Sequence, residues 1–204
     1  LDRERVAGEQ LADALRRDGA EVLFVHADVA VEADWRHALE RVQRRWERLD
    51  ILINNAGVSG SHPDVLNTDT WDEQMNVNAR GVFLGMRAVI PRMKEAGSGS
   101  IVNISSISGL TGQKFVHMGY NAAKGAVRLA TKAASVQFAR DNIRVNSVHP
   151  GLMPAMRTSM MSADPEVRRK MINAVPMGRE GRVEEVAHAN LFLASDDASY
   201  ITGI

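Results

Sequence analysis

The chain has 204 residues, and its 25 lysine and arginine residues balance 25 aspartate and glutamate residues. This balance, with 45% hydrophobic residues, excludes a disordered chain and disfavours a nucleic-acid binder that relies on overall basic charge. The sequence has no cysteine, no apolar leader and no run of about 18 apolar residues. We therefore expect a soluble, cytoplasmic protein without disulfides or a membrane partner.

Short apolar runs alternate with longer amphipathic stretches along the chain. A strand is predicted over residues 21–26, and Trp35, Leu39, Val42 and Trp46 then recur at helical spacing. The later predicted elements are a strand at 51–53, a helix over about 70–95, a strand at 101–104, a helix over about 119–140, a strand at 143–148 and a helix over about 183–194. This alternation predicts a doubly wound parallel sheet in three α/β/α layers, Rossmann-like, with residues 1–204 forming one domain.

Small, polar or turn-forming residues follow each predicted strand. They are Asp28-Val29, Asn54-Asn55-Ala56-Gly57, Ser105-Ser106 and His149-Pro150-Gly151. Ligands of parallel sheets bind beyond the carboxyl ends of the strands, so these four segments predict a site at one edge.

The pair Tyr120 and Lys124 has the spacing of one helical turn, which places both side chains on the same face of a helix. A nearby ammonium lowers the pKa of a tyrosine below its usual value of about 10. Such a tyrosine can exchange a proton with an alcohol or a carbonyl oxygen. The spacing alone also occurs by chance, and then indicates only a surface tyrosine beside a solvated lysine.

Several further motifs occur in a fixed order around this pair. They are Asn54-Asn55-Ala56-Gly57, Val77-Asn78-Ala79-Arg80-Gly81, Ser106 fourteen residues before Tyr120, Asn146-Ser147-Val148-His149-Pro150-Gly151 and Tyr200-Ile201-Thr202-Gly203. With these motifs in this order, the sequence resembles the classical short-chain dehydrogenase/reductase family over nearly its whole length. The resemblance implies an NAD- or NADP-dependent oxidoreductase that interconverts an alcohol and a ketone.

The resemblance also implies roles for individual residues. Tyr120 would be the general acid or base, and Ser106 would hydrogen-bond the substrate oxygen. Lys124 would bind the nicotinamide ribose and lower the pKa of Tyr120, while Asn78 would hold a water in a proton relay. Cofactor contacts are implied for Asp28, Val29, Asn54, Ala56, Gly57, Tyr120, Lys124, Pro150 and Gly151. Asp28 could instead cap a helix, and Asn54 could instead bond to a neighbouring backbone.

Other chemistries find less support. The six histidines show no metal-ligand spacing, and no Gly-x-Ser-x-Gly motif surrounds Ser106, so we expect neither a metal site nor a hydrolase. Methionines crowd the segment after Pro150-Gly151, at positions 153, 156, 160, 161, 171 and 177. Methionine usually fills core gaps, but here it favours an apolar lid over a lipophilic alcohol or ketone.

The sequence departs from the family pattern in two places. Ala155 stands where the family commonly has a threonine at the nicotinamide amide, and Thr158 could substitute for it. The glycine-rich phosphate turn, the first two strands and the end of the last strand are also missing, with Leu1-Asp2 entering the first helix directly. We therefore expect the fold to be incomplete in this chain and residues 21–26 to have no ladder partner. The residue that selects NAD or NADP ends the missing second strand.

Two competing functions remain open. A 3-oxoacyl-thioester reductase of fatty-acid synthesis has much the same residues, and a basic active-site mouth including Arg128 and Arg168-Arg169-Lys170 would favour it. A non-catalytic dinucleotide-binding or scaffold protein could share the fold, although it would not need Ser106, Tyr120, Lys124 and Asn78 together. The family implies a homo-oligomer, either a tetramer or a dimer.

Overall fold

The computed structural model describes residues 1–59, 61–114 and 116–204. In these residues three parallel strands form one sheet in the order β1-β2-β3. The strands are β1 (Ile51–Asn54), β2 (Gly99–Ile104) and β3 (Ile143–Val148). The predictions for all three are confirmed, and the sheet is parallel as expected.

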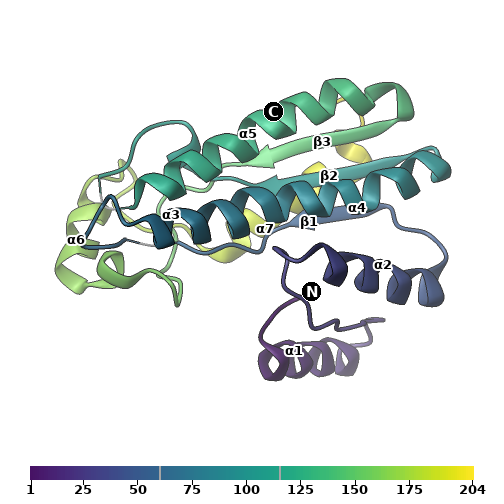
Figure 1. Ribbon diagram of the computed structural model, residues 1–204, viewed down its shortest axis with the longest axis horizontal. Coiled ribbons are helices and arrows are strands. Elements are labelled where there is room, and N and C mark those ends of the chain that lie inside the picture. Colours follow the sequence, from purple (N-terminus) through teal and green to yellow (C-terminus); the bar gives the residue numbers. More distant parts are fainter. Residues whose placement is uncertain (60, 115) are drawn as a thin grey trace.

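Helices cover both faces of this sheet, so the predicted α/β/α layering is confirmed. Helices α4 (Gly81–Ala96) and α5 (Met118–Phe138) lie on one face, and α7 (Val183–Ala194) lies on the other, as Figure 1 shows. The larger apolar core, which includes Met93, Ile101 and Val145, lies under α4 and α5. A smaller core of Val102, Ile104, Leu193 and Ala198 lies under α7.

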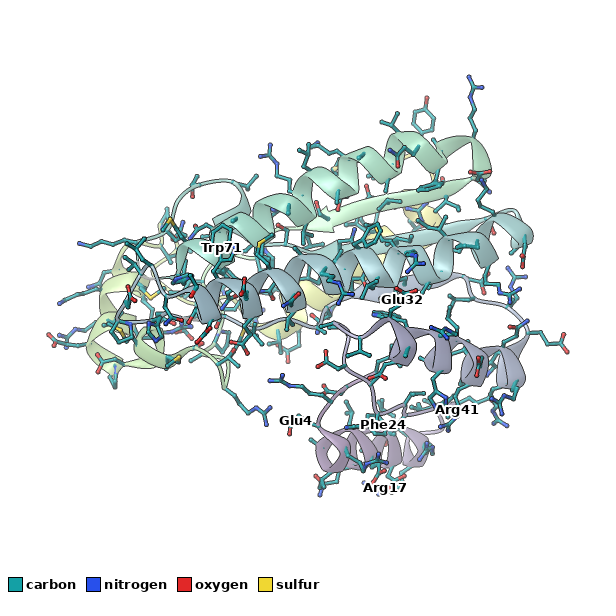
Figure 2. All side chains as sticks on the ribbon, in the orientation of Figure 1. Glu4, Arg17, Phe24, Glu32, Arg41 and Trp71 are labelled. Atoms are coloured by element: carbon teal, nitrogen blue, oxygen red, sulfur yellow. The ribbon has the colours of Figure 1, made fainter. Side chains whose placement is uncertain are left out.

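Residues 21–26 form no strand, so the predicted strand is wrong, whereas the expectation that this segment has no ladder partner is confirmed. Within the described chain this segment makes only an isolated parallel bridge, between Asp2 and His26. No ladder forms because a neighbouring backbone reaches the segment only at Asp2, whose N–H donates to the Val25 carbonyl at 3.3 Å and whose carbonyl accepts from Ala27. The Phe24 ring lies against Gly8 of helix α1 instead (Figure 2).

Two helices flank this segment. Helix α1 (Arg5–Arg17) begins three residues later than Asp2, because Asp2 is engaged in the bridge rather than in the helix. Helix α2 (Glu32–Trp46) has the predicted period, and Trp35 is buried. Glu32 at its start pairs with Arg87 of α4, which ties α2 to the helix layer above the sheet (Figure 2).

The helix predicted over about 70–95 is interrupted by one π-helical turn. Helix α3 (Thr68–Gln74) leads into the π-turn Met75–Arg80, and α4 follows it. Asn67 starts α3 by accepting a hydrogen bond from the Thr70 N–H at 2.8 Å. Such π-turns often occur at functional sites, and this one contains Asn78.

The region after β3 contains a helix whose bounds the sequence did not predict. Asp164 caps the N-terminus of helix α6 (Pro165–Asn173), and its side chain accepts from the N–H groups of Glu166 and Val167. Residues 201–204 return beside β3, where the Gly203 N–H donates to the Val145 carbonyl at 2.9 Å. No helix in the described part of the chain is long and apolar enough to span a bilayer.

Candidate active site

A cavity of about 980 Å³ lies beyond the carboxyl ends of the strands. Segments that follow β1, β2 and β3 line it, together with α5, α6 and α7. Of the residues predicted for the site, the lining includes Gly57, Asn78, Ser106, Tyr120, Lys124, Pro150 and Gly151. The motifs after the strands therefore predicted a site at the correct end of the sheet, and the structure brings most of the candidate residues together there.

Helix α5 places Tyr120 and Lys124 at this end of the sheet. His117 caps the N-terminus of this helix, and its ring Nδ1 accepts from the Gly119 N–H at 3.1 Å. One turn separates Tyr120 from Lys124, and the Lys124 Nζ lies 5.7 Å from the centre of the tyrosine ring. Ser106, which follows β2, lies close enough to the Tyr120 hydroxyl to lower its pKa. Two hydroxyl groups and an ammonium group thus meet in one cavity.

The loop after β2 approaches α5 unusually closely. A Cβ atom on Gly109 would lie 2.6 Å from the carbonyl oxygen of Lys124, so this position requires glycine. The Ser105 hydroxyl donates to the same carbonyl at 2.8 Å. The buried Lys124 ammonium donates to the Ile104 carbonyl at 2.8 Å. These contacts fix the Ser106 loop against the helix that carries Tyr120.

The electrostatics of the pair differ from the prediction. Burial raises the pKa of the Tyr120 hydroxyl above its ordinary value, and the hydrogen bond with Ser106 lowers it only in part. Burial also lowers the pKa of Lys124 to about 8. The predicted lowering of the Tyr120 pKa by Lys124 is therefore wrong in this structure, because desolvation of the phenol outweighs the lowering by Ser106.

Comparison with known proteins shows the family. The family model described as "Enoyl-(Acyl carrier protein) reductase" matches residues 1–204. Cyclopentanol dehydrogenase from Comamonas sp. is 43% identical over 204 residues, which cover 99% of this chain and 81% of that protein. The chain belongs to the short-chain dehydrogenase/reductase family. It is accordingly an NAD- or NADP-dependent oxidoreductase that acts on CH–OH groups.

Two further relatives of this family are similar over most of their length. The 3-alpha-(or 20-beta)-hydroxysteroid dehydrogenase of Mycobacterium tuberculosis is 41% identical over 206 residues, covering 100% of this chain and 73% of that protein. The crystal structure of a gluconate 5-dehydrogenase from Burkholderia cenocepacia, in complex with NADP and tartrate, superposes with a TM-score of 0.90. It is 32% identical, and the match covers 100% of this chain and 80% of that one.

The residues at the strand ends fit the nicotinamide half of the family's cofactor. Lys124 has three N–H donors, of which one reaches the Ile104 carbonyl, so further donors can bind ribose hydroxyls. A Cβ atom on Gly57 would lie 2.9 Å from the Asn78 Oδ1 and 3.6 Å from the Lys124 Nζ. Glycine at this position keeps the space beside Lys124 open for a ligand.

Asn78, the family's relay residue, lies fully buried in the π-turn. Its Oδ1 accepts from the Val58 N–H at 2.9 Å, and its amide donates to the Val58 carbonyl and to the Gln74 Oε1. These bonds hold the segment after Gly57 against the π-turn. The role of Asn78 in a proton relay stays a prediction.

Asp28 and Val29 are not among the residues that line the cavity. The carboxylate of Asp28 accepts from the Ala30 N–H at 2.8 Å, and α2 begins after Val31, so the alternative that Asp28 caps this helix is wrong. The Val29 carbonyl accepts from the Trp35 indole at 2.9 Å. Their contacts with a cofactor stay predictions.

Asn54 and Ala56 follow β1. The Asn54 amide donates to the Val82 carbonyl at 3.3 Å and to the Asn103 Oδ1 at 2.8 Å, so its structural alternative, a bond to neighbouring backbone, is present. Ala56 is exposed. The structure does not test a further contact of Asn54 or Ala56 with the cofactor.

The segment after Gly151 forms the apolar side of the cavity. Met153, Met156 and Met171 line it, whereas Met160, Met161 and Met177 are 50% or more exposed. Only three of the six methionines that were predicted to form an apolar lid therefore line the cavity. Ala155 is exposed, and neither Ala155 nor Thr158 lines the cavity. The Thr158 hydroxyl accepts from the N–H of Ser59, a lining residue, at 3.0 Å.

Several residues that line the cavity belong to none of the sequence motifs. They are Gln113, Lys114, Val116, Val175, Val183, Val186 and Asn190. Lys170, which the sequence analysis named, also lines the cavity. The lining positions on α7 could not be read from a motif, because they depend on how α7 packs behind the sheet. Within the described residues no group of three histidine or acidic side chains could hold a metal ion.

Proposed function

We propose that this oxidoreductase interconverts a lipophilic secondary alcohol and its ketone, with Tyr120 as the general acid and base. The observation that carries the proposal is that Ser106, Tyr120 and Lys124 line one cavity, with the Lys124 Nζ 5.7 Å from the centre of the tyrosine ring. A single oxygen atom of a substrate can contact both hydroxyl groups in this arrangement. Two donors on one carbonyl oxygen stabilise the negative charge that develops there during reduction.

Each residue then has a distinct task. The cofactor, when bound, supplies the hydride for reduction or accepts it during oxidation. Tyr120 gives its proton to the carbonyl oxygen during reduction and takes it from the alcohol during oxidation. Ser106 orients that oxygen. Lys124 would hold the nicotinamide ribose, and it carries a positive charge below its pKa of about 8.

Asn78 would contribute to the path by which the proton reaches solvent. The closeness of Gly57 to both Asn78 and Lys124 supports this role, because it places the π-turn beside the ammonium. A water bound there would link Lys124 to the outside of the protein.

The substrate class follows from the walls of the cavity. Met153, Met171, Val175 and Val186 offer apolar contacts, and two similar proteins are named for cyclopentanol and for hydroxysteroids. Asn190 lies in this wall, and among the described residues its buried Oδ1 has no hydrogen-bond partner, so one polar substrate group could bind there. We therefore expect cyclic or steroid-like alcohols to react best.

A 3-oxoacyl-thioester reductase remains the second candidate. The observation that favours it is the presence of Lys170 in the cavity wall, since an acidic carrier or a charged thioester would be attracted there. Arg128 is exposed on α5 and is not among the residues that line the cavity. Arg168 pairs with Glu180, so its charge is already balanced.

We further propose that the protein is a homo-oligomer, either a tetramer or a dimer, in the cytoplasm. Helices α4 and α5 carry exposed apolar side chains, namely Phe83 (56% exposed), Leu129 (69%) and Val136 (80%). Large exposed apolar side chains on a helix are typical of a surface that another subunit covers. Light scattering during size-exclusion chromatography tests this proposal, and a monomer at micromolar concentration would contradict it.

The proposed activity is tested with a substrate panel and both cofactors. The panel contains cyclic alcohols, a hydroxysteroid, a linear secondary alcohol and a 3-oxoacyl thioester, each with NAD or NADP in the matching redox state. We expect the cyclic alcohols or the steroid to give the highest kcat/KM. Preference for the thioester would support the second candidate, and cofactor binding without any turnover would support a scaffold.

A further inference from the structure

His149 directly follows β3, and it is a half-buried side chain for which the mechanism above has no role. Both nitrogens of its ring have hydrogen-bond partners. The Nδ1 lies 3.1 Å from the backbone carbonyl oxygen of Ser106, and the Nε2 lies 2.9 Å from the hydroxyl of Ser147. The ring therefore connects the end of β3 to the residue that is to orient the substrate oxygen.

The direction of the first bond follows from the chemistry of its partners. A carbonyl oxygen only accepts, so the His149 Nδ1 must carry a proton and donate it. The second bond has two arrangements. The Ser147 hydroxyl can donate to the Ile204 carbonyl at 2.9 Å while the Nε2 donates to it, or it can donate to a neutral Nε2. The bond to Ser106 is the same in both arrangements.

This bond lies between two backbone bonds that join the same loops. The Ser105 N–H donates to the Val148 carbonyl at 2.8 Å, and the Ile107 N–H donates to the Pro150 carbonyl at 3.1 Å. Between them, the Ser106 carbonyl accepts from His149 and also from the Gly109 N–H at 2.9 Å. Two donors thus use both lone pairs of this oxygen and fix the orientation of the peptide unit.

The orientation of that peptide sets the ψ angle of Ser106, and so the backbone from which its hydroxyl projects. The backbone of Ser106 is extended, with φ −170° and ψ 160°, and its hydroxyl also accepts from the Ser108 N–H at 3.1 Å. Rotation of the peptide would move the hydroxyl relative to Tyr120. A misplacement of about 1 Å in a catalytic group can reduce a rate on the order of 100-fold.

We propose that His149 is a positioning residue for Ser106, acting through the backbone carbonyl and not through contact with substrate. The proposal rests on the proposed function, in which Ser106 orients the reacting oxygen. It assigns the effect to the Nδ1 side of the ring alone. The bond from Nε2 to Ser147 would serve the stability of the strand end.

Three substitutions separate the two sides of the ring. In His149→Asn the amide nitrogen can occupy the place of Nδ1, whereas in His149→Gln it can reach only the place of Nε2. Ser147→Ala removes the partner of Nε2 and leaves the Nδ1 bond intact. We expect His149→Gln to lower kcat about tenfold or more, and His149→Asn and Ser147→Ala to stay within about threefold of the unchanged protein. The cofactor Kd stays unchanged in all three.

A double-mutant cycle with Ser106→Ala decides whether the effect passes through Ser106. If it does, His149→Gln has no additional effect on kcat once the serine hydroxyl is absent. The proposal would be overturned if the kcat losses of His149→Gln and Ser106→Ala multiplied in the double variant. It would also be overturned if His149→Asn lost as much kcat as His149→Gln. Should His149→Gln not unfold cooperatively, His149→Ala replaces it in both backgrounds. If Ser106→Ala alone left kcat unchanged, the proposed function itself would fail, and the two failures are thus distinct.

Discussion

The contact between Gly109 and helix α5 gives the sharpest structural prediction. Gly109 ends the short turn that follows Ser106, and a Cβ atom there would lie 2.6 Å from the Lys124 carbonyl oxygen and 2.9 Å from the Ser105 Oγ. Ordinary contact begins at 3.4 Å, so Gly109→Ala requires the turn and the helix to separate by about 0.8 Å. The oxygen that it meets is main chain, which cannot move by changing a rotamer.

This displacement falls between Ser106 and Tyr120, the two groups that are to share the substrate oxygen. A shift of about 1 Å reduces a rate on the order of 100-fold, so we expect kcat for alcohol oxidation to fall by about that factor. The strain also lowers the free energy of unfolding by about 1–3 kcal/mol. Steady-state kinetics and urea unfolding measure the two effects, and the Kd of the cofactor serves as a check on the remainder of the site.

Gly125→Ala is the matched control for this substitution. Gly125 adjoins Lys124 on the same helix, and a Cβ atom there would meet no atom within 4 Å. The control should therefore keep kcat near that of the unchanged protein. If Gly109→Ala also kept kcat within about threefold, the close contact would not set the position of Ser106, and the reasoning would be refuted.

Three other outcomes follow from the structure. Asn54→Ala should lower the free energy of unfolding by about 1–3 kcal/mol in urea, because it leaves the buried Asn103 Oδ1 without its donor; no change would contradict this network. Gly125→Ala should raise that free energy by about 0.5–1 kcal/mol, measured in the same way, because alanine favours helix more than glycine, and a decrease would show an unseen contact. Since burial raises the pKa of Tyr120 above its ordinary value, its hydroxyl stays protonated near neutrality. The rate of oxidation, which needs the deprotonated oxygen, should then rise with pH through and above neutrality, while ketone reduction should not. An oxidation rate that levels off below pH 8 would show that the charge of Lys124 outweighs burial.

Elements with a clear hydrophobic period could be predicted from the sequence. The β2 run is buried on both faces, and its continuous apolar pattern identified it as an interior strand. Residues 21–26 have the same kind of pattern but form no strand, because a strand depends on a neighbouring backbone as well as on its own side chains. The hydrophobic period of a segment reports its own side chains, and it does not report whether a neighbouring backbone lies within reach.

The candidate site was predictable where its residues occur as motifs. Tyr120, Lys124 and Ser106 share one cavity because helix spacing and the parallel sheet fix their relative places. The π-turn at Asn78 and the close approach at Gly109 depend on tertiary packing, and no local pattern encodes them. The direction of the Tyr120 pKa shift was missed for the same reason, since burial cannot be read from a one-turn spacing.

The most direct measurement is single-turnover hydride transfer by Tyr120→Phe with a secondary alcohol and saturating cofactor. This variant keeps the ring and removes only the hydroxyl that is to carry the proton. We expect the rate to fall about 10²–10⁴-fold while the cofactor Kd stays within about threefold. Hydride transfer at the rate of the unchanged protein would contradict the assignment of Tyr120 as the acid and base.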